Sequence, residues 1–403
     1  MKIQLGVFFG GKSVEHEVSV ITAAQTAAAM DADKYQIIPV YITKDNEMYT
    51  GADLLVPGNY RDLPSLLARS QRTALFREKG KVYLTRYPAR LFEKPFIARL
   101  DLAFPIVHGT NGEDGSLQGF FQLHGLPYVG SDVGASAGGM DKWMSKCLML
   151  SAGLPVLPGY TFRGSAYYAD PDGVVAALEA FHGYPLMVKP INLGSSVGIS
   201  PAHDGEGLRS AIELAASFTE RILVEPMLAD LREINCAVMG DADQTEASAC
   251  EEPLSSGEIL SFQDKYQGGG AGGKSAGKTG GGAPKGMGGS RKRLPAELEK
   301  EKEEEIRGLA QKAFLALNCS GVARVDFLLN REDGKVYVNE VNTIPGSMAF
   351  YLWEAAGKPF RQMTDELINL ALKRGRMQER LIWSNEVNLL SGMPQTGKGA
   401  AGK

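Results

Sequence analysis

The sequence predicts an α/β protein made of several units, because strand-like and helix-like segments alternate along the chain. An apolar run at residues 3–9 indicates a buried strand that ends at Gly10 and Gly11, and an Ala-rich helical segment follows it to about Met30. Two further apolar runs, at 35–42 and 102–107, have the length and composition of strands. We therefore expect a parallel sheet with packed helices in the first part of the chain.

The same kinds of segment recur in two later units. After a break near residue 130, the pattern predicts helices at 141–152 and 206–218 and strands at 185–189 and 222–226. A third unit, from about residue 229, has predicted strands at 234–239, 322–329 and 336–341 and a helix at 296–317. A terminal helix carries apolar residues on one face: Phe360, Met363, Leu367, Leu370 and Ala371. We expect domains at 1–130, 131–228 and 229–378, and a flexible polar tail at 379–403.

Composition excludes several classes of protein. With 403 residues, 44% hydrophobic and 22% charged, the chain has the composition of a globular protein. No apolar run approaches the ~18 residues of a transmembrane helix, and no signal peptide precedes the first strand, so we expect a cytoplasmic protein without a membrane partner. The net charge of −4 predicts no nucleic-acid partner. The four cysteines form no C-x-x-C pair, which favours reduced thiols over zinc or disulfides.

A glycine-rich segment at 268–282, GGGAGGKSAGKTGGG, matches the P-loop pattern twice. A working P-loop needs a buried strand before it and a helix that begins at Lys-Ser/Thr. Here polar residues 263–267 precede the segment, and a run from Gly280 to Pro284 that cannot continue a helix follows it. We therefore predict a flexible cationic loop, with a true P-loop as the alternative.

Polar side chains gather on the last two predicted strands. Glu340 and Asn342 alternate with apolar residues, so both point to one face beside the Pro-Gly turn at 345–346. Arg324 and Asp326 repeat this spacing on the preceding strand. Oxygen ligands on one face suit Mg²⁺, and a carboxylate among buried residues must be paired or metal-bound. We therefore favour a metal site over a solvent-facing strand.

Three glycine-containing loops follow predicted strands, where α/β sheets place their ligands. Lys189 ends an apolar strand, and the small residues after it can surround phosphate oxygens with N–H and hydroxyl groups. His108 begins a second loop, and the third covers residues 10–17. For His16 and Glu17 we favour solvent-facing positions in the first turn of the helix.

Seven motifs, in order along the chain, resemble those of the D-alanine–D-alanine ligase family of the ATP-grasp superfamily. They are GGKSVEHEVS (10–19), HGTNGEDGSLQG (108–119), MDK (140–142), VKPINLGSSVG (188–198), DKY (264–266), ARVDF (323–327) and NEVNTIPG (339–346). The resemblance spans roughly residues 3–375. It implies an α/β, three-domain ATP-grasp fold, in which an N-terminal parallel α/β domain precedes central and C-terminal α+β domains that clamp ATP. It also implies ATP-dependent ligation of two D-alanines through an acyl phosphate, for peptidoglycan precursor synthesis.

The resemblance assigns an ATP site and a metal site. Lys142 and Lys189 would hold the phosphates, with the loop that contains Ser195 covering them. Glu225 and the Leu228 backbone would contact adenine. The remaining residues expected at ATP are Ser196, Glu233, Lys265 and Asn342. Two Mg²⁺ ions, with Mn²⁺ as a substitute, would be bound by Asp326, Glu340 and Asn342.

The resemblance also assigns substrate contacts. Glu15 would bind the ammonium of the first D-alanine, and Ser195 and Tyr266 would connect it to a closing loop at about 264–294. Arg324 and the Gly346 N–H would stabilise the tetrahedral oxyanion. The remaining residues expected at the substrates are His108, Lys265 and Tyr351.

Two departures from the family pattern keep the acceptor open. The closing loop is longer and more basic than is usual, and residues 347–353 read SMAFYLW where most of the family has a Thr/Ser-bearing stretch that contacts the second substrate. The acceptor alternatives are D-serine, D-lactate or another D-amino acid, although Tyr266 argues against D-lactate. Another ATP-grasp ligase and a non-catalytic nucleotide-binding protein are further alternatives; Arg324 disfavours the second. Because the family is often dimeric, a homodimer is also expected.

Overall fold

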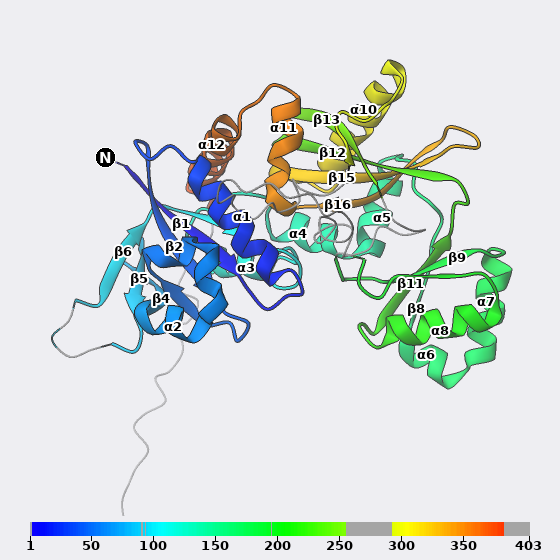
Figure 1. Cartoon of the computed structure of the whole chain (residues 1–403), viewed down its shortest axis with the longest axis horizontal. Coiled ribbons are helices and arrows are strands. Elements are labelled where there is room, and N and C mark those ends of the chain that lie inside the picture. The colour runs from blue at the N-terminus through cyan, green and yellow to red at the C-terminus, as the bar shows by residue number, and fades with distance from the viewer. Residues whose placement is uncertain (1, 90–91, 93, 195, 255–291, 383–403) are drawn as a thin grey trace, which may run out of the picture.

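The computed structural model describes residues 2–89, 92, 94–194, 196–254 and 292–382. Its described strands form three sheets, of seven, four and five strands. In Figure 1 the seven-stranded sheet lies at one end of the molecule and the four-stranded sheet at the other, with the five-stranded sheet above and between them. None of the helices in the described part of the chain has the length and apolarity that a membrane span requires.

The first sheet has the order β6-β5-β4-β3-β2-β1-β7. Its strands are β1 (Ile3–Gly10), β2 (Tyr35–Ile42), β3 (Met48–Thr50), β4 (Gln71–Glu78), β5 (Lys81–Arg86), β6 (Phe96–Leu100) and β7 (Leu102–Ile106). β1 pairs in parallel with β2 and β7, as predicted, and it is buried on both faces from Leu5 onward, which explains its apolar run at 5–9. From β3 to β6 the pairing is antiparallel, so the sheet is mixed rather than parallel throughout.

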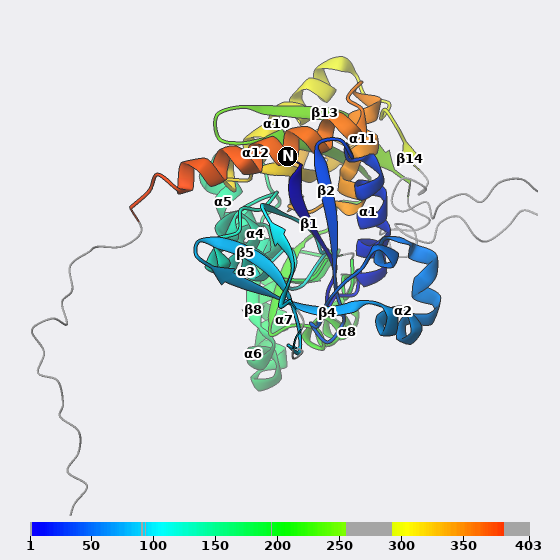
Figure 2. The ribbon, with the colours of Figure 1, turned by 90° about the vertical axis from the view of Figure 1, so that its left-hand side faces the viewer.

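Helices cover both faces of the first sheet. On one face, α1 (His16–Ala29) and α2 (Leu63–Arg69) pack with two short 3₁₀ helices, η1 (Ala52–Leu55) and η2 (Pro57–Asp62) (Figure 2). On the other face, Leu117 and Phe121 of α3 (Ser116–His124) pack against β1 and β2. Because β1 and β7 are parallel neighbours, the loops that follow them emerge at the same edge of the sheet.

The second sheet is antiparallel, with the order β10-β9-β11-β8. Its strands are β8 (Tyr160–Arg163), β9 (Leu186–Pro190), β10 (Ser200–Ala202) and β11 (Arg221–Pro226). The packed helices are α6 (Gly164–Ala169), α7 (Pro171–Phe181) and α8 (Gly205–Ala216). One face of α8 is buried against the sheet through Leu208, Ala211, Ile212 and Ala215. The opposite face of the sheet is therefore directed toward the rest of the molecule.

The third sheet has the order β14-β13-β12-β15-β16 and is also antiparallel. Its strands are β12 (Leu231–Gly240), β13 (Thr245–Pro253), β14 (Lys292–Arg293), β15 (Gly321–Asn330) and β16 (Val336–Asn342). One face packs on α4 (Val133–Met140), α5 (Lys142–Ser151) and α10 (Lys300–Ala316). The helix α10 begins later than predicted because the Ala296 N–H donates to the Cys250 carbonyl at 2.8 Å, which ties that residue to β13.

The first and third sheets share one apolar core, which fixes their relative position. It includes side chains of α1, of the short helix η4 (Gly346–Ala349), of α11 (Phe350–Ala355) and of α12 (Phe360–Gln378). On α12 the predicted apolar face is confirmed: Phe360, Met363, Leu367 and Ala371 are buried, and Leu370 packs against them. This shared core brings the loops of the first sheet against the end of β16.

Candidate active site

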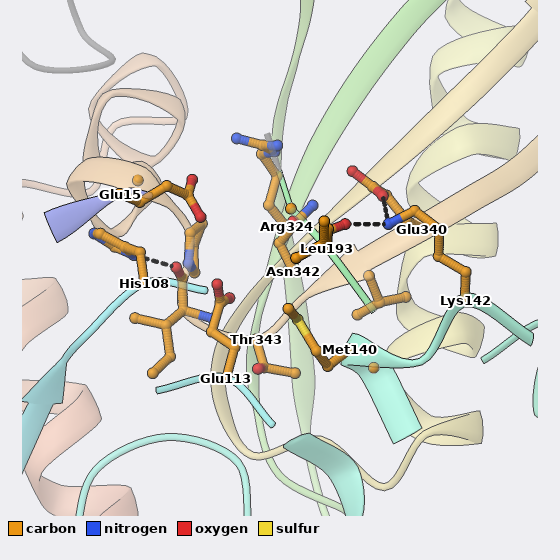
Figure 3. Close-up of a pocket in the computed structure, with 16 residues that line it drawn as sticks. Glu15, His108, Glu113, Met140, Lys142, Leu193, Arg324, Glu340, Asn342 and Thr343 are labelled. Carbon is orange, nitrogen blue, oxygen red and sulfur yellow. Dashed lines mark hydrogen bonds and ion pairs between the residues drawn. The ribbon is translucent and has the colours of Figure 1, made fainter. Parts of the chain in front are cut away.

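A polar pocket, here called the first pocket, lies where the loops after β1 and β7 meet the ends of β15 and β16 (Figure 3). Glu15 lies at the N-cap of α1 and His108 in the loop after β7, whereas Arg324 and Glu340 come from the third sheet. Lys142, at the start of α5, also lines it, and its Nζ donates to the Leu193 carbonyl in the loop after β9 at 2.8 Å. Residues predicted from separate motifs therefore meet at one place.

A second pocket lies between the second and third sheets. Lys189 enters it from β9, Glu225 from β11 and Asp326 from β15. Lys142 and Glu340 line both pockets, so the two are adjacent. The second pocket holds most of the residues expected at ATP: Lys142, Lys189, Ser196, Glu225, Leu228 and Glu233.

The three predicted metal ligands lie together on neighbouring strands. Asp326 is directly opposite Glu340, and Arg324 is opposite Asn342. The Asn342 amide donates to Asp326 Oδ2 at 3.1 Å, which leaves its own oxygen as a donor atom for a cation. No three His, Cys, Asp or Glu side chains form a metal-binding group in the described ranges, so this cluster offers two carboxylates and one amide. That oxygen set fits a hard divalent cation such as Mg²⁺.

Arg324 is a buried cation that its neighbour keeps charged. Its Nε and Nη2 donate to the two carboxylate oxygens of Asp326 at 2.6 and 2.7 Å. Burial alone would lower the pKa of Arg324, but the Asp326 carboxylate holds it well above its ordinary value. A guanidinium has five N–H donors and Asp326 uses two, so the others can donate to an anion in the first pocket.

Glu225 is a buried carboxylate held by two lysines. Lys146 Nζ and Lys189 Nζ each lie 2.5 Å from its oxygens. Burial would raise the pKa of Glu225, but the two ammonium groups lower it, so the group is ionised. Sequence reasoning missed Lys146; the signal was its place one helical turn after Lys142. An ionised Glu225 can accept a hydrogen bond from an adenine amino group.

Glu15 is closely surrounded by glycine backbone. It is 6% exposed, and a Cβ on Gly109 or Gly194 would lie only 3.0 or 3.1 Å from its Oε2. Both loops approach the carboxylate this closely because neither glycine has a side chain. Glu15 thus lines the first pocket with a carboxyl group, the kind of group that can bind an ammonium.

The prediction of a solvent-facing first turn is wrong for His16. Its side chain is 4% exposed, with Nδ1 2.6 Å from the Gly11 carbonyl and Nε2 2.9 Å from the Tyr41 hydroxyl. These contacts turn the ring inward and fix the loop after β1 on β2. The prediction is confirmed for Glu17, which is exposed and pairs with Lys44 at 2.7 Å.

Tyr351 lies away from the wall of the first pocket. Its hydroxyl donates to Glu251 Oε1 at 3.0 Å, and Lys292 Nζ lies 3.1 Å from its ring centroid. Burial and the Glu251 carboxylate raise the pKa of Tyr351. The hydroxyl is thus engaged by Glu251, and the expected contact between Tyr351 and a substrate stays a prediction.

Glu113 is a pocket residue that the prediction omitted, although it stands in the quoted motif after His108. Burial, together with the nearby Glu15 carboxylate, raises the pKa of Glu113 to about 8. Its two oxygens accept the backbone N–H groups of Gly109 and Ile344. Ser195, Lys265, Tyr266 and the Gly-rich segment at 268–282 lie outside the described residues.

The fold and the site define a class of protein. Two units, built on the second and third sheets, face each other around a pocket lined by lysines and carboxylates, which is the ATP-grasp arrangement. The chain belongs to the D-alanine–D-alanine ligase family, as its motifs predicted. The family model "D-ala D-ala ligase N-terminus" matches residues 4–131, and "D-ala D-ala ligase C-terminus" matches 148–277 and 285–369.

Individual relatives agree with this assignment. D-alanine–D-alanine ligases of Acetivibrio thermocellus and Caldicellulosiruptor bescii are each 38% identical to the chain, the first over 91% of this chain and 95% of the relative, the second over 96% and 99%. The solved D-alanine-D-alanine ligase from Coxiella burnetii superimposes with a TM-score of 0.74 at 30% identity, covering 94% and 96%. The VanG D-Ala:D-Ser ligase from Enterococcus faecalis has the same TM-score and identity, covering 92% and 100%.

Proposed function

We propose that the protein joins two D-alanines at the expense of ATP, through a D-alanyl phosphate, for peptidoglycan precursor synthesis. The observation that carries the proposal is that Lys142 and Glu340 line both pockets. A phosphate bound in the second pocket is therefore next to a carboxylate bound in the first. This adjacency is what transfer of a phosphoryl group to a carboxylate requires.

In the second pocket, Lys142 and Lys189 bind the phosphates, and Glu225, Leu228 and Glu233 bind the nucleoside. Ser195, Ser196 and Lys265 complete the ATP contacts in this proposal. Asp326, Glu340 and Asn342 hold two Mg²⁺ ions, for which Mn²⁺ can substitute. When bound, these cations offset the repulsion between the anionic carboxylate and the anionic phosphate.

In the first pocket, Glu15 binds the ammonium of the first D-alanine. The amine of the second D-alanine attacks the acyl carbon, and phosphate leaves from the tetrahedral intermediate. Arg324 and the Gly346 N–H donate to the oxyanion of that intermediate. Ser195 and Tyr266 connect Glu15 to the closing loop at about 264–294, which excludes water from the acyl phosphate. A homodimer and a cytoplasmic location stay predictions.

The acceptor is the part of the proposal with a specific alternative. The curated relatives named above are D-alanine–D-alanine ligases, which supports D-alanine. A D-Ala:D-Ser ligase of equal structural similarity, together with the aromatic stretch at 350–353, supports another acceptor. The two readings share every step before attack by the amine.

A competition assay tests both the reaction and its acceptor. We expect D-alanyl-D-alanine as the dominant product when D-alanine is supplied with equimolar D-serine, D-lactate and larger D-amino acids at neutral pH, with products weighed by mass spectrometry. A dominant mixed product would refute the D-alanine acceptor and leave the ligase chemistry intact. Absence of any ATP-dependent product would contradict the ligase itself.

The Gly-rich segment is not the nucleotide site in this proposal. Replacing both Lys274 and Lys278 by alanine is expected to leave ATP affinity nearly unchanged, because the phosphate-binding lysines are elsewhere. Lys189→Ala, which removes a cation from the second pocket, should weaken ATP binding strongly. Calorimetric titration with ATP measures both. Loss of ATP binding in the double variant would restore the P-loop interpretation.

A further inference from the structure

The backbone just after Gly346 is held in an unusual conformation. Ser347, Met348 and Ala349 all have φ of 52°, in the left-handed region that side chains disfavour. All three residues are buried. Three successive non-glycine residues in this region are costly, so the surrounding structure must impose the conformation. Side chains from the loop after β7 and from α1 bind the backbone on either side of Gly346.

The peptide of Ile344 is bound on both of its polar sides. His108 Nδ1 lies 2.8 Å from the Ile344 carbonyl, a contact drawn in Figure 3, and Glu113 Oε1 accepts the Ile344 N–H at 2.9 Å. The other oxygen of Glu113 accepts the Gly109 N–H at 2.8 Å. The loop after β7 thus holds the loop after β16 through two side chains.

A third side chain holds the same loop at Ser347, the residue that directly follows the Pro-Gly turn. Thr22 Oγ1, on α1, accepts the Ser347 N–H at 3.1 Å and lies 3.2 Å from His108 Nε2. Because a carbonyl can only accept, His108 Nδ1 carries the proton toward Ile344, and its Nε2 accepts from the Thr22 hydroxyl. One neutral tautomer of His108 therefore satisfies every contact in the network.

We propose that Thr22, His108 and Glu113 form a clasp that fixes the backbone at 344 and at 347 and so positions the Gly346 N–H between them. The inference rests on the proposed function, in which Gly346 donates to the oxyanion. Such a donor is effective only when its position is set in advance, and a small displacement costs rate rather than affinity. The three residues are thus positioning residues, and His108 and Glu113 act through backbone rather than through substrate.

Thr22 gives the sharpest test, because it is 0% exposed and does not line the first pocket. Thr22→Val keeps the shape and removes the acceptor of the Ser347 N–H. We expect kcat to fall roughly five- to hundredfold, the range that a lost buried hydrogen bond allows, with the KM for D-alanine and ATP unchanged. Thr22→Ser, which keeps the hydroxyl, should restore most of the rate.

Thr26→Val is the matched control. Thr26 is one turn later on α1 and equally buried, but its hydroxyl donates only to the Thr22 carbonyl of its own helix. We expect it to keep the wild-type kcat. A readout independent of turnover is amide hydrogen exchange, which should become faster at 344–349 in Thr22→Val and not in Thr26→Val.

Equal kcat and equal exchange in Thr22→Val and Thr26→Val would overturn the clasp. If Thr22→Val does not fold, kcat and hydrogen exchange are compared between Thr22→Ala and Thr26→Ala instead, and equal values would again overturn the clasp. Failure of the proposed function is distinguishable, because it would appear as an inactive wild-type protein, whereas the hydrogen-exchange comparison needs no activity.

Discussion

Replacement of Glu340 by glutamine is expected to abolish turnover at physiological Mg²⁺ while leaving the fold intact. The amide keeps the shape of the side chain but removes a negative charge that faces both pockets. Glu340 also lies 3.3 Å from the Lys142 ammonium, so the variant loses a partner of the phosphate-binding lysine as well. Since a bound cation supplies several kcal/mol of charge stabilisation, kcat should fall by on the order of a thousandfold or more.

Measuring activity against Mg²⁺ concentration distinguishes the loss of a metal ligand at Glu340 from a general disturbance of the third sheet. Partial recovery of Glu340→Gln activity at raised Mg²⁺, or with Mn²⁺, would support the assignment, and near-normal activity at low Mg²⁺ would rule it out. Glu332→Gln, in the exposed turn before the same strand, is the control and should behave as wild type. Thermal unfolding of both variants checks that the sheet is preserved.

The strands that the sequence predicts best are those buried on both faces. β1 is apolar almost throughout because helices cover both faces of the sheet. Its amino-acid sequence therefore indicates a buried strand without any knowledge of the neighbouring strands. In β4 only Thr73 and Leu75 are buried, and the other residues of the strand are partly or fully exposed. Its place in the sheet is decided by antiparallel pairing with β3 and β5, which no local pattern encodes.

A similar distinction holds at the site. Asp326 and Glu340 could be predicted because a carboxylate within an apolar strand is itself unusual. Thr22 could not, because a threonine inside a helix is ordinary and its partner, the Ser347 N–H, is 325 positions away. Lys146 and Glu113 did stand near sequence signals, one helical turn after Lys142 and within a motif, but the buried partner of each is supplied by another part of the fold.

Arg324→Lys should lower kcat by about 10² to 10³ with little change in the KM for ATP. A lysine has one compact ammonium and three donors, so it cannot bind both oxygens of Asp326 and still donate to an oxyanion in the first pocket. The matched control is Arg232→Lys on β12. The Arg232 guanidinium binds Glu252 in the same two-point manner, at 2.9 and 2.8 Å, but lines neither pocket.

The step affected identifies the role of Arg324. If Arg324 stabilises the oxyanion formed during peptide bond formation, Arg324→Lys should still form the acyl phosphate reversibly. Positional isotope exchange of labelled ATP in the presence of D-alanine should then persist, while the rate of dipeptide release falls. Equal loss of both signals would instead place the defect in phosphoryl transfer, through an Asp326 carboxylate that has lost its two-point partner. A similar fall in Arg232→Lys would show that the sheet, rather than the oxyanion donor, had been damaged. The Arg324 guanidinium contacts Asp326, a proposed metal ligand, and also lines the first pocket. Its replacement therefore measures whether phosphoryl transfer and peptide formation both depend on this one side chain.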